Sequence, residues 1–454
     1  MVSWHPSVYL AQRTPKAAKN ILAAPPLILS ISFIFLILIG TLILKLPIST
    51  TVPVTWSQSL FNATSAVTVT GLVVFDVGTV YTTFGQVVVA LLIQLGGLGI
   101  MTFAIVTLLA LGAKIGFLQN AIAKEAYNST NTATLVTTAK SVLIFSLCVE
   151  LIGMIILAVS WSDELGWRTS LFHGFFYTIS AFNNAGIGLS PDSLMPYVED
   201  PIINLTITAL FIIGGLGFTV WIDLWRKKRW DKLTTYSKMM IIGTISINAV
   251  AVLAIYCIEY NNPKTLVPLS ETGKWLASWF QAVTPRTAGF NTLAMNELED
   301  ATTAIMLMLM FIGGGSLSTA SGIKVVTFMV LILATYGYLR RYDVVYVYHR
   351  GISKDTISKA LALAMISVGT IWTSIFFLLL SENASMIDII FEAVSAFGTV
   401  GLSRGLTSNL TVTGQFIIIF LMFMGRLGPL TLAYFLASPK LKRIRYPETK
   451  LTIG

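Results

Sequence analysis

The chain has 454 residues, of which 55% are hydrophobic and only 11% charged, and its mean hydropathy is +0.78. A soluble protein has about a quarter of its residues charged, so this composition excludes a soluble enzyme. The formal net charge of +9 does not indicate nucleic-acid binding, because no aromatic and basic recognition motif accompanies it. The sequence predicts an integral membrane protein in a lipid bilayer.

Apolar runs long enough to cross a hydrocarbon layer of about 30 Å form four pairs. The eight predicted spans are 26–46 with 85–112, 139–160 with 202–224, 238–259 with 302–339, and 357–380 with 413–437. Within each pair lies a shorter apolar segment, at about 56–67, 169–182, 273–284 and 385–397. We interpret these segments as re-entrant pore helices, which are tolerated at membrane depth only where protein or water surrounds them.

Each short segment leads into small residues that end in a glycine, at Gly71, Gly186, Gly289 and Gly401. Backbone carbonyls that face a narrow axis can replace the water around a potassium ion. Glycine permits the alternating backbone conformations that this requires. The residues just before the glycines differ (Thr70, Ala185, Ala288 and Val400), so the backbone is expected to matter more than the side chains. The alternative is that the small residues only let helices pack closely.

The second helix of each pair carries another landmark at nearly constant spacing from that glycine, at Gly97, Gly215, Gly314 and Arg426. Two landmarks in four units indicate an internal repeat. The predicted repeats are 26–112, 139–224, 238–339 and 357–437, flanked by tails at 1–25 and 438–454. Because each repeat crosses twice, all four share one orientation. We therefore predict an all-α polytopic membrane protein with four parallel helix–pore helix–filter–helix repeats around a pseudo-fourfold pore axis.

Most of the 30 basic residues lie in the tails and in the links between the predicted repeats. The positive-inside rule then places both termini in the cytoplasm. The opposite side carries acidic residues near the pore-helix loops, such as Asp192, Glu199 and Asp300. A negative mouth would concentrate cations, although ordinary solvated loops have a similar composition.

The third repeat differs from the others, since its second helix is too long for one span and is interrupted between Gly313 and Gly322. Irregular backbone at that depth is expected to line a cavity, so this segment is predicted to act as a gate, with a packed kink as the alternative. The predicted gate residues are Gly313, Gly314, Gly315, Ser316, Thr319, Ser321, Gly322, Lys324 and Arg426.

Three ionisable residues lie within or beside predicted spans. Arg426 is a functional candidate because a buried arginine is costly. It either opposes a cation below the filter, donates to the carbonyls of the gate, or only caps a helix. Lys324 could extend to the cytoplasmic interface. Glu150 needs a polar partner that the sequence does not identify.

Enzymatic function is not indicated by any motif. The histidines His5, His173 and His349 are scattered, with no zinc spacing and no phosphate-binding loop of the G-x-x-x-x-G-K-[ST] type. ATP hydrolysis by this chain is therefore not expected, and ion gradients or a partner must supply the energy.

Taken together, the four hairpin repeats with single filter glycines, the glycine-rich interruption and Arg426 resemble the Trk/Ktr/HKT superfamily of cation transporters. With eight spans and no additional N-terminal helix pair, the chain resembles most the membrane subunits of bacterial Ktr potassium uptake systems. The resemblance covers about residues 20 to 440.

Several expectations follow from the resemblance alone. It implies a homodimer in the bacterial inner membrane and potassium uptake often stimulated by sodium. A cytosolic ring of RCK-type regulatory subunits, which would carry the nucleotide (ATP or ADP), is expected at the cytoplasmic face, with 226–238, 340–359 and the C-terminal tail as docking surfaces. The implied filter residues, whose backbone alone would hold K⁺, are Thr68, Val69, Thr70, Gly71, Asn183, Asn184, Ala185, Gly186, Arg286, Thr287, Ala288, Gly289, Gly398, Thr399, Val400 and Gly401.

The glycine at position 71 favours potassium, because plant members of the superfamily that prefer sodium commonly have serine there. Two other functions remain open. One is a sodium-selective or sodium-coupled carrier that opens alternately to each side, and the other is a membrane sensor that conducts nothing. Parallel repeats and four retained glycines favour the pore over both.

Overall fold

The computed structural model describes residues 25–99, 132–316, 318–342 and 344–428. The predicted tails, the basic residues Lys114 and Lys124, and the ends of the spans predicted at 85–112 and 413–437 lie outside the described residues.

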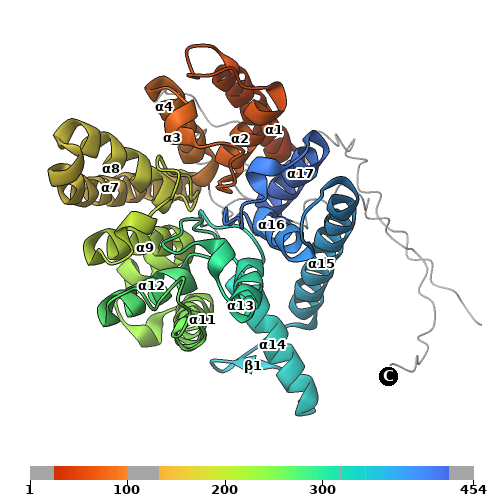
Figure 1. Cartoon of the computed structure of the whole chain (residues 1–454). Helices are drawn as coiled ribbons and strands as arrows, with labels where there is room; N and C mark the ends of the chain where they lie inside the picture. Colours follow the sequence, from red (N-terminus) through yellow and green to blue (C-terminus); the bar gives the residue numbers. More distant parts are fainter. Residues whose placement is uncertain (1–24, 100–131, 317, 343, 429–454) are drawn as a thin grey trace, which may run out of the picture.

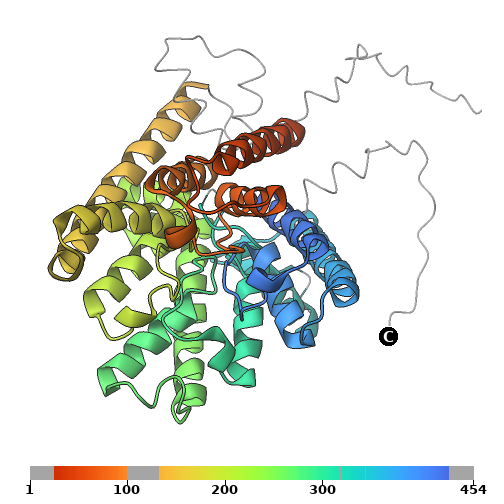
Figure 2. The ribbon, with the colours of Figure 1, turned by 45° about the horizontal axis from the view of Figure 1, so that its top comes forward.

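The described part of the chain is mostly helical, and its helices lie in four groups around a common centre (Figure 1). The first group contains α1 (Pro25–Lys45), α2 (Trp56–Thr68), α3 (Val77–Val80) and α4 (Thr83–Gly97), and the second contains α7 (Thr132–Leu165), α8 (Trp167–Phe182), α9 (Pro201–Leu216) and α10 (Phe218–Lys227). The third contains α11 (Thr235–Glu259), α12 (Glu271–Val283), α13 (Asp300–Phe311) and α14 (Val325–Leu339), and the fourth α15 (Lys354–Ser381), α16 (Met386–Gly398) and α17 (Val412–Leu427). The view turned by 45° shows the groups following one another in order of colour (Figure 2).

Short elements connect these helices. Strands β1 (Tyr346–Val347) and β2 (Arg350–Gly351) pair antiparallel in a small hairpin between α14 and α15. The 3₁₀ turns are η2 (Met195–Tyr197), η3 (Trp230–Lys232), η4 (Met295–Glu297) and η5 (Thr407–Asn409).

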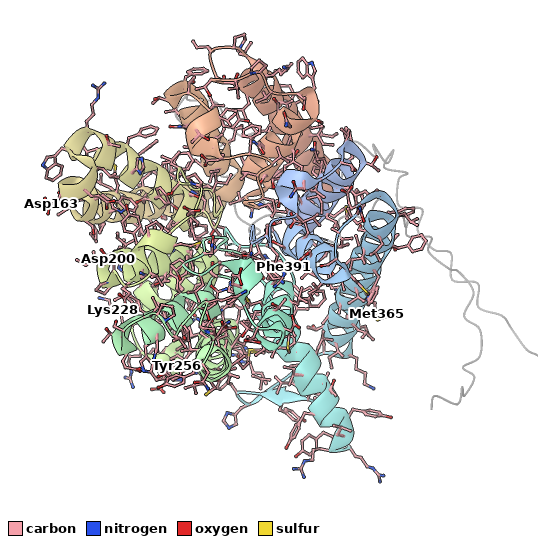
Figure 3. All side chains as sticks on the ribbon, viewed as in Figure 1. Asp163, Asp200, Lys228, Tyr256, Met365 and Phe391 are labelled. Atoms are coloured by element: carbon pink, nitrogen blue, oxygen red, sulfur yellow. The ribbon has the colours of Figure 1, made fainter. Side chains whose placement is uncertain are left out.

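The outer helices expose large apolar side chains, with Phe35 of α1 64% exposed and Leu380 of α15 71% exposed. Met365 of α15 lies at the outside of the molecule, whereas the buried Phe391 of α16 lies toward the centre (Figure 3). Apolar exposure over whole helices is typical of a surface that faces lipid. This surface agrees with the prediction of an integral membrane protein.

Among the described residues, three helices are long and apolar enough to cross a membrane, at Ala139–Leu165, Thr235–Glu259 and Lys354–Ser381. The bent pair α9 and α10 raises this number to four if it is counted as one span. The apolar helices at Ser30–Lys45, Thr83–Gly97, Asp300–Phe311, Val325–Leu339 and Val412–Leu427 are shorter.

The span predicted at 202–224 is not a single straight helix. Helix α9 ends at Leu216 and α10 begins at Phe218, at an angle of 89° to α9. Gly217 between them has φ 97° and ψ 134°, a conformation that only glycine adopts readily. The apolar run continues through this break, so hydropathy alone does not reveal it.

Three of the four short helices, α2, α12 and α16, begin after a residue whose side chain caps them, whereas Gly166 before α8 forms no side-chain cap. The hydroxyl of Thr55 accepts from the backbone of Gln58, whose side chain accepts from the Thr55 backbone in return. Ser270 caps α12 and Ser385 caps α16 in the same way, through one hydroxyl each. Such caps satisfy backbone N–H groups that have no partner in the first turn.

One phenylalanine at the middle of each short helix is fully buried, and the four are Phe61, Phe176, Phe280 and Phe391. They stand nine or ten positions before the four glycines. Burying a phenylalanine contributes about 1.5–3 kcal/mol. These side chains therefore fix the short helices in the interior, so that their C-terminal ends meet at the centre.

Candidate ion pathway

Near the centre of the molecule, each short helix ends and is followed by one of the four glycines within a few residues. The four segments that end in these glycines are 68–71, 183–186, 286–289 and 398–401. The structure brings all sixteen residues predicted as filter residues into these segments, and nearly all of them are buried.

The backbone of the four segments alternates in the same manner. The glycines have positive φ, at 100° for Gly71, 67° for Gly186, 82° for Gly289 and 91° for Gly401. The residue two positions earlier also has positive φ in every segment, at Val69, Asn184, Thr287 and Thr399. A positive φ is rare for a residue other than glycine and marks a functional or strained backbone. Three of these residues are β-branched, so their residue types do not predict this conformation.

Each of the four glycines lies against the next segment, in a cycle. A Cβ atom placed on Gly71 would come within 3.0 Å of the carbonyl oxygen of Ala185, the residue before Gly186. The same holds for Gly186 with the Ala288 carbonyl, Gly289 with the Val400 carbonyl, and Gly401 with the Thr70 carbonyl. The first segment thus contacts the second, the second the third, the third the fourth and the fourth the first. We call these four glycines and the four carbonyls the glycine ring.

Hydroxyl groups at the ends of the short helices hold the ring segments in place. Ser65 Oγ accepts from the Gly71 amide at 3.0 Å, and Ser395 Oγ accepts from the Gly401 amide at 3.2 Å. Ser180 and Thr284 instead donate to the carbonyls of Ile187 and Phe290, just after the glycines. These bonds leave the ring carbonyls Thr70, Ala185, Ala288 and Val400 available to a ligand.

The two threonines that could add a lower ion site differ. The Thr68 hydroxyl donates to the Thr64 carbonyl at 2.8 Å and lies 2.7 Å from the Thr70 hydroxyl, so it already has local partners. The Thr399 hydroxyl is buried without a hydrogen-bond partner. Thr399 is therefore the one of the two whose hydroxyl has no local partner among the described residues.

The interruption predicted in the third repeat lies between α13 and α14, where the described residues among 312–324 form no helix. We call these residues the 312–324 loop. Its ends are joined by a bridge between Ile312 and Ile323, with the Gly313 amide donating to the Ile323 carbonyl at 2.8 Å. The Gly315 amide donates to the Gly215 carbonyl at 2.8 Å, which attaches the loop to the end of α9.

Thr319 connects the 312–324 loop to a ring segment. Its hydroxyl lies 2.6 Å from Asn184 Oδ1 and 3.2 Å from the Phe182 carbonyl. Asn184 belongs to the second segment of the glycine ring, so loop and ring are in direct contact.

Arg426 links the loop to the first group of helices. One guanidinium nitrogen donates to the Thr319 carbonyl and to Ser321 Oγ at 3.1 Å. The other donates to the carbonyls of Gly96, at 2.5 Å, and Gly97, at 3.1 Å, at the end of α4. The Lys324 ammonium group donates back to the Ala320 carbonyl of the same loop at 2.8 Å.

Comparison with known proteins identifies the family. The chain matches the model of the TrkH family, described as cation transport protein, over residues 8–444. The chain belongs to the TrkH family. The superfamily predicted from the filter glycines, the interruption and Arg426 is thereby confirmed.

Relatives in the TrkH family match nearly the whole chain. It is 46% identical to the Ktr system potassium uptake protein B of Bacillus subtilis, over 97% of this chain and 99% of that protein. Identity to the protein of the same name from Vibrio alginolyticus is 41%, over 94% and 95%. Identity to the potassium/sodium uptake protein NtpJ of Enterococcus hirae is 32%, over 95% and 97%.

A solved structure shares the fold. The potassium transporter TrkH from Vibrio parahaemolyticus superimposes with a TM-score of 0.74, over 94% of this chain and 87% of that one, at 18% identity.

One buried polar network of this TrkH-family protein was not foreseen. Glu150 of α7 accepts from Gln94 Nε2 of α4 through both carboxylate oxygens, at 2.9 and 3.0 Å. Asn183 Nδ2 donates to Gln94 Oε1 at 2.7 Å. Glu150 thus has the polar partner that the sequence left unidentified, and through Gln94 it reaches the first residue of a ring segment. The partners lie 56 and 33 positions away, so no local motif could have shown them.

Proposed function

We propose that this chain carries potassium ions through a channel-like pore whose narrowest part is the glycine ring. The cyclic contact of four segments of one chain, each with a positive-φ glycine beside a carbonyl of the next, carries this proposal. Carbonyl oxygens held around an axis replace the hydration shell of a potassium ion. Potassium uptake is also what the names of the Bacillus and Vibrio relatives describe.

The finer architecture belongs to the same proposal. We take the four groups of helices as four parallel repeats related by a pseudo-fourfold axis, with eight spans in total. The shorter helices, such as α4 and α17, would then each form one part of a span. The basic links and tails place both termini in the cytoplasm of a bacterial cell, with the chain in its inner membrane.

We further propose that the 312–324 loop closes the pore below the ring and that Arg426 holds it there. The hydrogen bonds of Arg426 to Thr319 and Ser321 support an anchoring role over a simple block by its charge. Shortening the loop between Gly313 and Gly322 should raise potassium flux. Unchanged flux in a variant that reaches the membrane would contradict the gate.

We propose that partner proteins and ions control the gate. We propose a homodimer that docks on a cytosolic RCK-type ring, with ATP or ADP bound to that ring and Na⁺ as an activator. The exposed basic residues Arg340, Arg341 and Arg350, around the hairpin of β1 and β2, support the docking surface at 340–359. The two Ktr relatives are named as proteins of a "system", which supports the proposal of a partner subunit.

A second function is a sodium-selective or sodium-coupled carrier, which the name of the Enterococcus relative keeps open. Both functions are tested by potassium and sodium uptake in cells that lack their own potassium transporters. Wild type should restore growth at low potassium, and Gly71→Ser should lose potassium preference while still reaching the membrane.

Gly99→Ser is the matched control, because Gly99 also has positive φ but a Cβ there meets no described residue within 4 Å. If Gly71→Ser and Gly99→Ser both behave like wild type, the ring is not the filter. If wild type takes up sodium and potassium together in a fixed ratio, the sodium-coupled carrier is the better explanation than the channel.

A further inference from the structure

Arg286, the first residue of the third ring segment, is a buried cation that points away from the ring. Its side chain is 8% exposed. One guanidinium nitrogen donates to Asn248 Oδ1 at 3.0 Å and the other to Thr244 Oγ1 at 3.4 Å. Both acceptors are neutral, and Arg286 Nε is buried with no hydrogen-bond partner. No carboxylate of the described residues forms an ion pair with this arginine.

An uncompensated charge at this depth is costly, because low-dielectric surroundings replace water. Arg404, which is also largely buried, shows the usual solution, since its Nε lies 2.8 Å from Asp388 Oδ1. Arg286 has no such partner within the part of the chain that the structure describes. A counter-ion from solution would supply what the protein does not.

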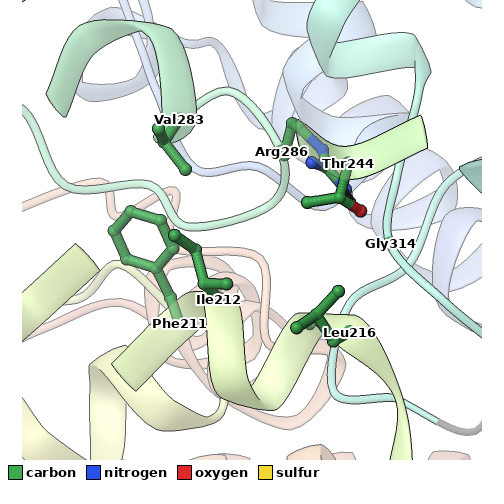
Figure 4. A pocket seen from close by; sticks show the side chains of 8 residues that line it. Phe211, Ile212, Leu216, Thr244, Val283, Arg286 and Gly314 are labelled. Carbon is green, nitrogen blue, oxygen red and sulfur yellow. Dashed lines mark hydrogen bonds between the residues drawn. The ribbon is translucent and has the colours of Figure 1, made fainter. Parts of the chain in front are cut away.

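A small cavity adjoins the guanidinium group (Figure 4). Arg286 and Thr244 line one side of it, and apolar side chains, among them Phe211 and Leu216, line the rest. The space open to the centre of a water-sized particle is about 20 Å³. That is enough for one or a few particles of that size. It is too small for a phosphate headgroup with its glycerol.

We propose that this cavity binds a small monovalent anion, chloride in the cell, with Arg286 as its counter-charge. An ordered water needs two to four polar partners, and the mostly apolar walls offer few. An anion instead gains from the charge itself and from the free Nε–H. Among the described residues, no acidic side chain lines the cavity, so no carboxylate there repels an anion.

The site would also touch the loop that we propose as the gate. Gly314 of the 312–324 loop lines the cavity together with Gly215, whose carbonyl accepts from the Gly315 amide. A bound anion would therefore neutralise the charge of Arg286 in a cavity that is lined by both a ring segment and the 312–324 loop. The test of the anion site needs no ion flux, so its failure can be distinguished from a failure of the proposed pore.

The experiment uses the full-length purified protein at one fixed potassium concentration, with gluconate replaced stepwise by bromide. Thermal unfolding of wild type should show a saturable rise in Tm, on the order of 2–4 °C, because an ion that binds only the folded state stabilises it. Crystals grown in bromide should show an anomalous peak beside Arg286. Arg286→Met, which removes the charge but keeps much of the length, should show no dependence of Tm on bromide.

Arg404→Gln is the matched control, since it removes a buried arginine that already has a carboxylate partner, and its bromide response should equal that of wild type. Non-specific salt effects would move all three proteins alike. The proposal is overturned if Arg286→Met responds to bromide as wild type does, or if wild type does not respond. It is equally overturned if the bromide crystals show no anomalous peak in the cavity, a result that does not depend on any variant folding.

Discussion

Gly401 lies against the carbonyl oxygen of Thr70, so the last ring segment of the chain is in contact with the first. The two residues are more than 300 positions apart in sequence. Their contact completes the ring within one polypeptide, so no second copy is needed to enclose the centre.

Replacing Gly401 by alanine should disrupt potassium uptake. The new Cβ would overlap the Thr70 carbonyl and the Cα of Gly71, and φ at this position is 91°. The positive φ alone costs about 1–3 kcal/mol, and the overlap displaces a ring carbonyl. We expect uptake to fall by at least about tenfold, which corresponds to 1.4 kcal/mol, in a transport assay with matched membrane levels.

Gly405→Ala separates strain from overlap. Gly405 has a φ of 101°, but a Cβ there meets nothing within 4 Å. This variant should keep near-normal uptake with some loss of stability. Equal loss of uptake in both variants would show that backbone strain, and not the ring contact, is responsible.

Removing the Ser321 hydroxyl should loosen the gate. Arg426 donates to Ser321 Oγ at 3.1 Å, and such a bond contributes about 1 kcal/mol, which changes a two-state ratio about fivefold. Ser321→Ala should therefore raise potassium leak by a few fold in proteoliposomes. Ser316→Ala is the control, because Ser316 is exposed and, among the described residues, its one hydrogen bond runs from its backbone amide to the Tyr236 hydroxyl. A leak that is the same in both variants would argue against anchoring by Arg426.

Glu150→Leu should weaken both stability and ion preference. The change leaves Gln94 Nε2 without its acceptor, and an unpaired buried group costs about 1–3 kcal/mol. Gln94 also accepts from Asn183, so the start of a ring segment loses support. We expect a lower Tm and a lower potassium-to-sodium uptake ratio, with Glu150→Gln milder in both. A lower Tm with an unchanged ratio would assign the network to folding alone.

Acid should weaken the attachment of Glu199 to Ser270. The Ser270 hydroxyl and amide donate to Glu199 Oε1 at 2.6 and 2.7 Å, and these bonds lower the pKa of that carboxyl. The charged form is thus favoured in the folded protein. Its contribution is present above the usual glutamate pKa of about 4.3 and is lost as the pH falls through the lower folded value. Unfolding temperatures measured between neutral pH and this range should converge for wild type and Glu199→Gln; a constant difference would contradict the linkage.

The sequence reveals the short helices well, because apolar patterning and caps such as Ser385 mark them locally. The segment predicted at 56–67 is α2 (Trp56–Thr68), and that predicted at 385–397 is α16 (Met386–Gly398). The sequence also indicates the positions of the four ring glycines. These signals lie within a few residues of the features that they indicate.

Features that depend on distant contacts could not be predicted. The positive φ of Val69 opposes the preference of a β-branched residue and is imposed by the surrounding structure. The bend at Gly217 lies within an unbroken apolar run, and the environment of Arg286 comes from α9, α11 and the 312–324 loop. Hydropathy averages over such positions, so it cannot locate them.

Because the glycine ring is made of four unlike segments of one gene product, a single substitution alters only one quarter of it. In a pore built from four identical subunits, the same substitution would appear four times at once. Val400 can therefore change without Thr70, Ala185 or Ala288 changing with it. Such a pore can acquire a new ion preference in small, separately selectable steps.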